Sequence, residues 1–277
     1  MSVLVLSGGG QGVWSMLGAL SVMYQTLDFD VYIGTSVGGI VATLLSIGFE
    51  PNDLFEKLNI INISNKPSLR KCIEDYGFCE IQNIIDCVLD LILTKFEYIP
   101  TLIQLYETYG NDLVITSVCL NTQETIYFQH GTHPNVSISD ALYATCSIPF
   151  IVKPHRIEDK LYIDGGMSDH FPITHAKQHY NDKTVYGIKL HVPVPTIHDM
   201  FSYTMNVLLF AMEKINGVQN VDERVITLES DITYSMNIFK PVCNKHALYE
   251  NGKQEVHKQF KPIICNHDYN ESSRVAQ

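Results

Sequence analysis

The sequence predicts a single α/β domain in which a mostly parallel sheet is flanked by helices. Short runs rich in β-branched residues alternate with segments of helical periodicity, which is the pattern of repeated strand–helix units. The chain has 277 residues, 45% of them hydrophobic and 18% charged, enough for one domain with a substantial core. No repeat or flexible linker divides it, so we expect one domain at residues 1–261 and a C-terminal tail at 262–277 that is a candidate for disorder.

The expected elements follow one another in this alternating order. A strand at residues 3–7 leads into a glycine-rich loop and a helix at residues 14–24. A second strand at 31–34 ends in a turn containing Ser36, a helix continues over 37–47, and Pro51 lies near the first position of the next helix. Later strands are expected at residues 113–119, 125–128, 161–163, 185–192 and 224–228, and later helices at 80–96, 138–144, 173–180, 199–215 and 245–260.

The charge balance bears on the class of partner. With 30 acidic and 19 basic residues the formal net charge is −11, and the Lys and Arg residues form no cluster. Nucleic-acid binding needs a basic face, so no nucleic-acid partner is expected. The same acidity disfavours electrostatic docking on anionic membranes, and any peripheral membrane contact should be made through apolar side chains.

Cysteine usage and the first residues bear on the compartment. The seven cysteines are an odd number without a Cys-x-x-Cys spacing, which suggests reduced thiols. The first residues show no basic leader, and the longest apolar run, residues 37–49, is shorter than the ~20 residues of a membrane-spanning helix. We therefore expect a soluble cytoplasmic protein whose contact with membranes would be peripheral.

Ser36 lies in a turn that suits a nucleophile. Gly34 and Gly38 stand two residues before and two residues after this serine, between the second strand and an apolar helix. Such glycines allow a sharp strand-to-helix turn in which the serine is strained and exposed. The start of the helix carries the positive end of its dipole, which would stabilise a developing alkoxide. A plain glycine-rich turn fits the pentapeptide equally well, so this motif alone does not decide.

A glycine loop at residues 7–12 (SGGGQG) follows the first strand and opens the first helix. A dinucleotide-binding loop of the form G-x-G-x-x-G would have glycine at position 13, where this chain has Val13. An oxyanion hole instead needs backbone amides that converge on one point. Because the loop occurs together with the serine turn, we predict that Gly8, Gly9 and Gly10 form an oxyanion hole, with the unencumbered amides of Gly9 and Gly10 as donors.

Asp164 is the predicted proton acceptor for Ser36. Residues 161–166 (LYIDGG) place this aspartate after a short apolar strand and before Gly165 and Gly166, so that no neighbour crowds the carboxylate. We expect it at the carboxyl edge of the sheet, where α/β proteins hold their catalytic groups. Desolvation would raise its pKa and thereby its basicity toward a hydroxyl. An Asp-Gly turn without a catalytic role is the common alternative.

In this order, the glycine loop, the G-x-S-x-G serine and the D-G-G aspartate resemble the patatin-like phospholipase family. Residues 144–154 (ATCSIPFIVKP), 164–173 (DGGMSDHFPI) and, more weakly, 247–252 (ALYENG) are similar to further motifs of that family, so the resemblance covers residues 1 to about 260. It implies a three-layer α/β/α fold and a Ser36–Asp164 dyad that works without histidine. It also implies phospholipase A-type hydrolysis of fatty-acyl esters of glycerophospholipids or other glycerolipids, with no metal or organic cofactor.

The chain departs from the family pattern at Val152, where an aromatic residue is usual, and at three positions nearer the predicted catalytic groups. Gly12 stands where the family loop commonly has arginine or lysine, and Val13 replaces the last glycine of that loop. Substrate range or rate could therefore differ from the family's. His170 replaces the asparagine that usually follows the D-G-G motif. It is either a structural substitute or a group that tunes the aspartate, and we favour the structural role.

Other functions stay open at this point. The altered loop suits a lipid-binding or partner-binding pseudoenzyme, a lipid transacylase would share the acyl-enzyme, and a late histidine (His246, His257 or His267) would suit an α/β-hydrolase. His175 and His179 are a candidate metal pair on one helix face, but the adjacent glutamate and a third ligand are missing, so no metal site is expected. The sequence carries no signal for an oligomeric state.

Overall fold

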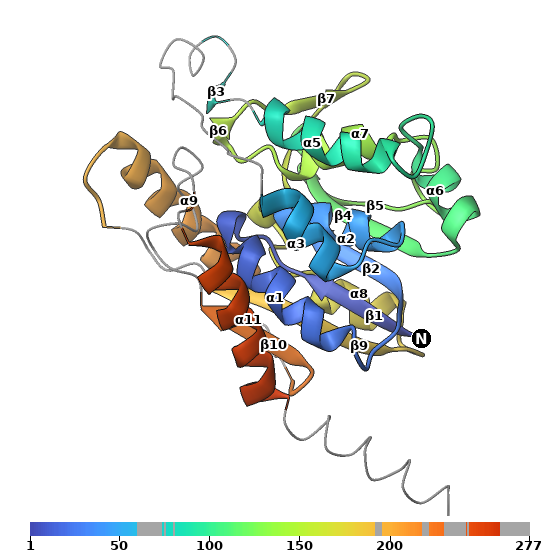
Figure 1. Ribbon diagram of the computed structural model, residues 1–277. Helices are drawn as coiled ribbons and strands as arrows, with labels where there is room; N and C mark the ends of the chain where they lie inside the picture. Colours follow the sequence, from blue (N-terminus) through green and yellow to red (C-terminus); the bar gives the residue numbers. More distant parts are fainter. Residues whose placement is uncertain are drawn as a thin grey trace, which may run out of the picture.

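The computed structural model of the chain describes residues 1–59, 74, 76–79, 81–191, 196–217, 222–229, 242 and 244–260. Within these residues a central sheet lies between helices, which confirms the predicted α/β fold class (Figure 1). The expected tail at residues 262–277 lies outside the described residues, and the domain boundary at residue 261 stays a prediction.

The central sheet has eight strands, in the order β10-β9-β1-β2-β4-β8-β7, with β5 paired to β4 beside this path. The pairs among β10, β9, β1, β2 and β4 are parallel, whereas β5, β7 and β8 join through antiparallel pairs. Two further strands, β3 (Gly77–Cys79) and β6 (Phe150–Val152), form a separate parallel pair. The strands of the main sheet are β1 (Ser2–Leu6), β2 (Phe29–Thr35), β4 (Asp112–Cys119), β5 (Glu124–Phe128), β7 (His155–Ile157), β8 (Lys160–Asp164), β9 (Thr184–His191) and β10 (Val225–Glu229).

Side-chain alternation divides the core between the two faces of the sheet. In β1, Leu4 and Leu6 belong to the larger cluster of buried side chains, whereas Val3 and Val5 belong to the smaller cluster on the other face. The smaller cluster is covered by α8 (Ile173–His179). Helices that contribute to the larger cluster are α1 (Val13–Met23), α2 (Val37–Ser46), α3 (Pro51–Asn59), α5 (Gln82–Leu93), α6 (Leu102–Tyr109), α7 (Ile138–Thr145), α9 (Met200–Asn216) and α11 (Lys245–Gln259).

Most expected elements are present with ends that differ by a few residues, but α6, β3, β6 and β7 were not anticipated. Helix α6 carries clear local signals, because Thr101 and Gln104 form a capping box and Gly110 ends the helix in the left-handed region. Each of the three strands has only three residues, which is too short for a side-chain period to be recognised. The short strands therefore depend on tertiary pairing.

Candidate active site

Ser36 occupies the turn between β2 and α2. Its φ of 55° and ψ of −127° lie in a region that non-glycine residues rarely adopt, a strain that is common at functional turns. The Ser36 amide donates to the Thr145 hydroxyl oxygen at 2.7 Å, and that hydroxyl donates to the Thr116 carbonyl at 2.6 Å. These bonds hold the predicted strand–turn–helix elbow in place. The motif at residues 144–154 marks this region, but nothing in the sequence assigns Thr145 this task.

The two glycines of the elbow are required by close backbone approach. A β-carbon on Gly34 would lie 2.3 Å from the Gly38 carbonyl oxygen. A β-carbon on Gly38 would lie 2.5 Å from the carbonyl oxygens of Leu6 and Ser7 at the end of β1. Backbone atoms cannot yield as side chains do, so any larger residue would open the turn. The spacing of glycines around Ser36 therefore has a direct steric cause.

Asp164 reaches Ser36 along one edge of β4. Parallel strand β2 ends with Thr35 opposite Thr116, and antiparallel strand β8 ends with Asp164 opposite Ser117. Both strands lie on the edge of β4 opposite β5, because β5 pairs with residues 115–119 along the other edge. The two strands thus approach head to head and their ends meet. As the sequence predicts, Asp164 is the last residue of its strand, and it lies beside the carboxyl end of β2; the sequence did not indicate that β8 runs antiparallel to β4.

The Asp164 carboxylate is buried beside the Ser36 hydroxyl. Only 5% of the residue is exposed. The carboxylate accepts a hydrogen bond from the Gly166 amide at 2.7 Å, and the Ser36 hydroxyl lies close enough to interact with it. Burial raises the pKa of Asp164 from 3.8 to about 6, although the Ser36 hydroxyl and the Gly166 amide oppose this rise. A carboxylate of this pKa accepts a proton from a hydroxyl more readily than an exposed aspartate does.

The turn after Asp164 fits closely against β4. A β-carbon on Gly165 would lie 2.4 Å from the Thr116 carbonyl oxygen, so this position also has no room for a side chain. The Asp164 amide donates to the Ser147 carbonyl at 2.9 Å. The carboxylate is therefore fixed by its own backbone as well as by Gly166.

The glycine loop lines the same cavity as Ser36 and Asp164. Gly9 and Gly10 have φ values of 145° and 54°, which favour glycine. The Gly8 amide donates to the His170 carbonyl at 3.1 Å, whereas no turn or loop hydrogen bond within the described residues uses the amide of Gly9 or Gly10. The prediction that Gly8 shares in the oxyanion hole is thus wrong for its amide, because that N–H group already has an acceptor. The amides of Gly9 and Gly10 are the available donors.

Leu190 of β9 accounts for the unusual residue at position 12. A β-carbon on Gly12 would lie 2.9 Å from Leu190 Cδ1, so a long basic side chain has no room there unless Leu190 moves. Val13 begins α1 and lines an apolar cavity beside Ser36. At both positions where the chain departs from the family loop, apolar side chains therefore lie close to the loop.

His170 packs between the glycine loop and the turn after β8. A β-carbon on Gly8 would lie 2.9 Å from the His170 Cε1, and one on Gly166 would lie 3.2 Å from its Nδ1. Burial and the positive charge of Lys189 lower the pKa of His170 to about 4, so the ring is neutral at pH 7. Its backbone makes two bonds, from its amide to Asn216 Oδ1 at 2.6 Å and from the Gly8 amide to its carbonyl. This arrangement supports the structural role.

Asn216, near the end of α9, is a site residue that the sequence does not reveal. Its side chain accepts the bond from the His170 amide and donates to the Gly166 carbonyl at 3.2 Å. The Gly166 amide in turn bonds to Asp164, and the His170 carbonyl bonds to Gly8. Asn216 thereby ties both the carboxylate turn and the glycine loop to α9. Its partners lie 46 and 50 residues away in the sequence, so no local pattern marks it.

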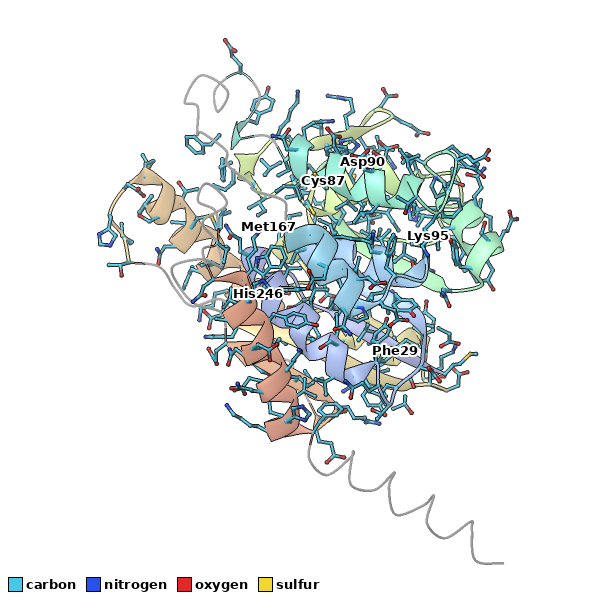
Figure 2. The ribbon with its side chains drawn as sticks, in the orientation of Figure 1. Phe29, Cys87, Asp90, Lys95, Met167 and His246 are labelled. Carbon is cyan, nitrogen blue, oxygen red and sulfur yellow. The ribbon has the colours of Figure 1, made fainter. Side chains whose placement is uncertain are left out.

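Two cavities meet at Ser36, and Gly10 and Ile148 also line both. The first cavity is almost wholly apolar and extends under α5; its walls include Val13, Trp14, Ile40, Ile81, Ile84, Ile85, Val88 and Val152. The second cavity is larger and more polar, with Asp164, His170, Lys189, His191 and Glu213 in its walls beside apolar side chains. Met167, labelled in Figure 2, lines this second cavity next to α9.

The other candidate groups do not join this site. His175 and His179 stack with ring centroids 4.0 Å apart, and the described part of the chain holds no cluster of three His, Cys, Asp or Glu side chains that could bind a metal ion. His246 packs edge-on against an aromatic ring of α3, His257 is exposed, and His267 lies outside the described residues. Among the described helices, none has the length and hydropathy needed to cross a membrane.

Comparisons with known proteins place the chain in a family. The sequence model described as patatin-like phospholipase matches residues 4–177. The chain is 29% identical to "Probable lipid hydrolase 463L" of Invertebrate iridescent virus 6, over 74% of this chain and 72% of that protein. It is 27% identical to uncharacterized protein R571 of Acanthamoeba polyphaga mimivirus, over 94% of each. Its fold is similar to that of VipD from Legionella pneumophila, with a TM-score of 0.61 and 15% identity over 94% of this chain and 67% of that one. The chain therefore belongs to the patatin-like phospholipase family.

Proposed function

We propose that this chain is a serine lipid acyl hydrolase of phospholipase A type, which cleaves fatty-acyl esters of glycerophospholipids or other glycerolipids. The observation that carries the proposal is the placement of the Ser36 hydroxyl beside the buried Asp164 carboxylate, at the junction of two cavities. Family membership and the relative named as a probable lipid hydrolase support the same class of reaction.

In the proposed mechanism, the Ser36 Oγ attacks the ester carbonyl carbon while its proton passes to the Asp164 carboxylate. The amides of Gly9 and Gly10 and the N-terminus of α2 stabilise the negative charge that develops on the carbonyl oxygen. When the tetrahedral intermediate collapses, the bond to the alcohol breaks and Asp164 returns the proton to it. Water then attacks the acyl-serine with Asp164 again accepting a proton, and the fatty acid is released.

The two cavities suit the two parts of such a substrate. The apolar cavity, walled by Trp14 and the inner side of α5, fits a fatty-acyl chain. The second cavity is lined by Lys189 and Glu213, which carry opposite charges, and it opens beside Asp164, where the leaving alcohol would take its proton. A pair of opposite charges is complementary to a zwitterionic headgroup, which favours glycerophospholipids over triglycerides as substrates.

We also propose that the protein works in the cytoplasm. Cys87, Cys119 and Cys146 are free thiols in the structure, and free thiols are typical of a reducing compartment. Measurement of the redox state of these thiols in the native host compartment would test this assignment.

The function is tested by labelling and by hydrolysis of defined lipids. A fluorophosphonate probe should label Ser36 in the wild type and fail to label Ser36→Ala, and Asp164→Asn should lower both labelling and phospholipid hydrolysis by about 10²- to 10⁴-fold. Asp169→Asn is the matched control, because this carboxylate in the same motif accepts a bond from the Tyr127 hydroxyl. It should keep its labelling.

Two outcomes would contradict the proposal. A well-folded wild type that is not labelled would be a pseudoenzyme, and full activity in Asp164→Asn would exclude the dyad. Hydrolysis of phosphatidylcholine and triglyceride, each with and without an added acceptor lipid, separates a hydrolase from a transacylase. Acyl transfer that outpaces release of fatty acid would replace hydrolysis as the main activity.

A further inference from the structure

Helix α9 exposes a row of large apolar side chains, here called the α9 outer face: Met200, Tyr203, Val207 and Phe210. These positions are three or four residues apart and so lie on one side of the helix. Val207 is 49% exposed and Phe210 is 62% exposed. An apolar row of this extent on the surface is typical of an interaction site.

The opposite side of α9 forms a wall of the catalytic cavity. Met205, Leu208, Met212 and Asn216 line the cavity that holds Ser36. At about 100° per residue, these four positions lie across the helix from the outer face. Only α9 itself therefore separates the exposed apolar row from the proposed site of ester cleavage. Figure 1 shows that this helix lies at the margin of the molecule.

The charge distribution indicates which kind of apolar partner fits. Residues 200–212 contain no charged side chain, in a protein of net charge −11. Lys214 stands at the end of the outer face, with its ammonium 5.5 Å from the centre of the Phe210 ring. An anionic surface would be repelled by the protein as a whole, whereas a zwitterionic lipid surface needs no basic patch. Lys214 and the neighbouring Glu213 are both exposed at this margin and carry opposite charges, which suits a zwitterionic surface; the lysine stem can lie along apolar surface while its charge stays in water.

We propose that the α9 outer face rests on the surface of zwitterionic phospholipid and that lipid enters the catalytic cavity along this helix. The inference rests on the proposed function, because it supplies the surface from which that function draws its substrate. Asn216 links this surface to the catalytic groups, because its side chain hydrogen-bonds to the Gly166 carbonyl and to the His170 amide. Docking at α9 thus occurs on an element bonded to both halves of the site.

The test separates docking from catalysis by using the full chain with Ser36→Ala. Flotation with phosphatidylcholine vesicles should recover this protein with the lipid. Adding Val207→Glu or Phe210→Glu should weaken the vesicle partition on the order of tenfold or more, because a charge replaces a buried apolar side chain. The matched control is Leu93→Glu, since Leu93 is 44% exposed at the end of α5, away from α9. It should float as the parent does.

The same substitutions with Ser36 intact give the second measurement. Val207→Glu and Phe210→Glu should lose hydrolysis of vesicle phospholipid while keeping hydrolysis of a soluble short-chain ester, because neither side chain lines the catalytic cavity. Equal flotation of Val207→Glu, Phe210→Glu and Leu93→Glu would overturn the inference. So would a wild-type dimer that both α9 variants convert to monomers while vesicle binding is unchanged, since a second copy would then cover this face. If flotation depends on α9 but no lipid is hydrolysed, the proposed function fails and the docking surface does not.

Discussion

Replacing Asp164 by asparagine should greatly lower activity and make the protein more stable at neutral pH. Burial raises the pKa of Asp164 from 3.8 to about 6, so the folded protein binds this proton more tightly than the unfolded chain does. The stabilisation by the protonated group is fully present below pH 3.8 and is lost as the pH rises through about 6. A tenfold change in proton affinity corresponds to about 1.4 kcal/mol, so the free energy of unfolding at pH 8 is lower by about 3 kcal/mol than it is with Asp164 protonated.

Asparagine removes this penalty with little loss of bonding. Its Oδ1 can still accept from the Gly166 amide, which lies 2.7 Å from the aspartate oxygen, and its size is nearly the same. Asp164→Asn should therefore unfold at higher urea concentration than the wild type at pH 8. At pH 5 the gain in free energy of unfolding over the wild type should be about half of its value at pH 8, because the cost of ionising Asp164 builds up between its unfolded and folded pKa values.

The assay is urea unfolding from pH 5 to pH 8, followed by fluorescence of Trp14, which is the only tryptophan and is buried. Ser36→Ala is the control, since it also removes a catalytic group but keeps the buried carboxylate. It should retain the loss of stability with rising pH, and this loss should vanish in Asp164→Asn. The reasoning would be refuted if the wild type and Asp164→Asn differed in stability by the same amount at every pH. It would also be refuted if Asp164→Asn were less stable than the wild type at pH 8.

Three further predictions follow from the same structure. Activity on a soluble ester should rise with pH through an apparent pKa of about 6, because Asp164 must be deprotonated to accept the proton; a pH-rate profile that is flat from pH 5 to 7 would contradict this. Asn216→Ala should lower kcat on the ester by about tenfold to a hundredfold with a smaller change in KM, since it misplaces catalytic groups that remain present; steady-state kinetics that show an effect on KM alone would exclude this positioning role. Gly252→Ala should destabilise the fold by about 2 kcal/mol, because its β-carbon would lie 1.9 Å from the Ser15 carbonyl oxygen between α11 and α1; an unchanged urea midpoint would disprove that contact.

Local constraints made much of the site predictable from sequence. The turn at Ser36 needs glycine at positions 34 and 38 because a β-carbon at either position would lie within 2.5 Å of a backbone carbonyl oxygen, so the motif and the elbow have one steric cause. The alternation of buried valine and leucine in β1 and the apolar side of α5 follow from the side-chain periods of strand and helix. The positions of Ser36, Asp164 and the glycine loop could therefore be assigned before the fold was known.

The meeting of these groups was decided only by the tertiary structure. Nothing in residues 160–164 specifies that β8 runs antiparallel to β4, because the same apolar residues suit either direction of pairing. That direction brings Asp164 head to head with Ser36. The acceptor for the Gly8 amide and the bonds of Asn216 likewise join segments that are far apart in the sequence. Side-chain period and turn sterics are properties of neighbouring residues, whereas strand direction and these hydrogen-bond partners exist only once the whole sheet has assembled.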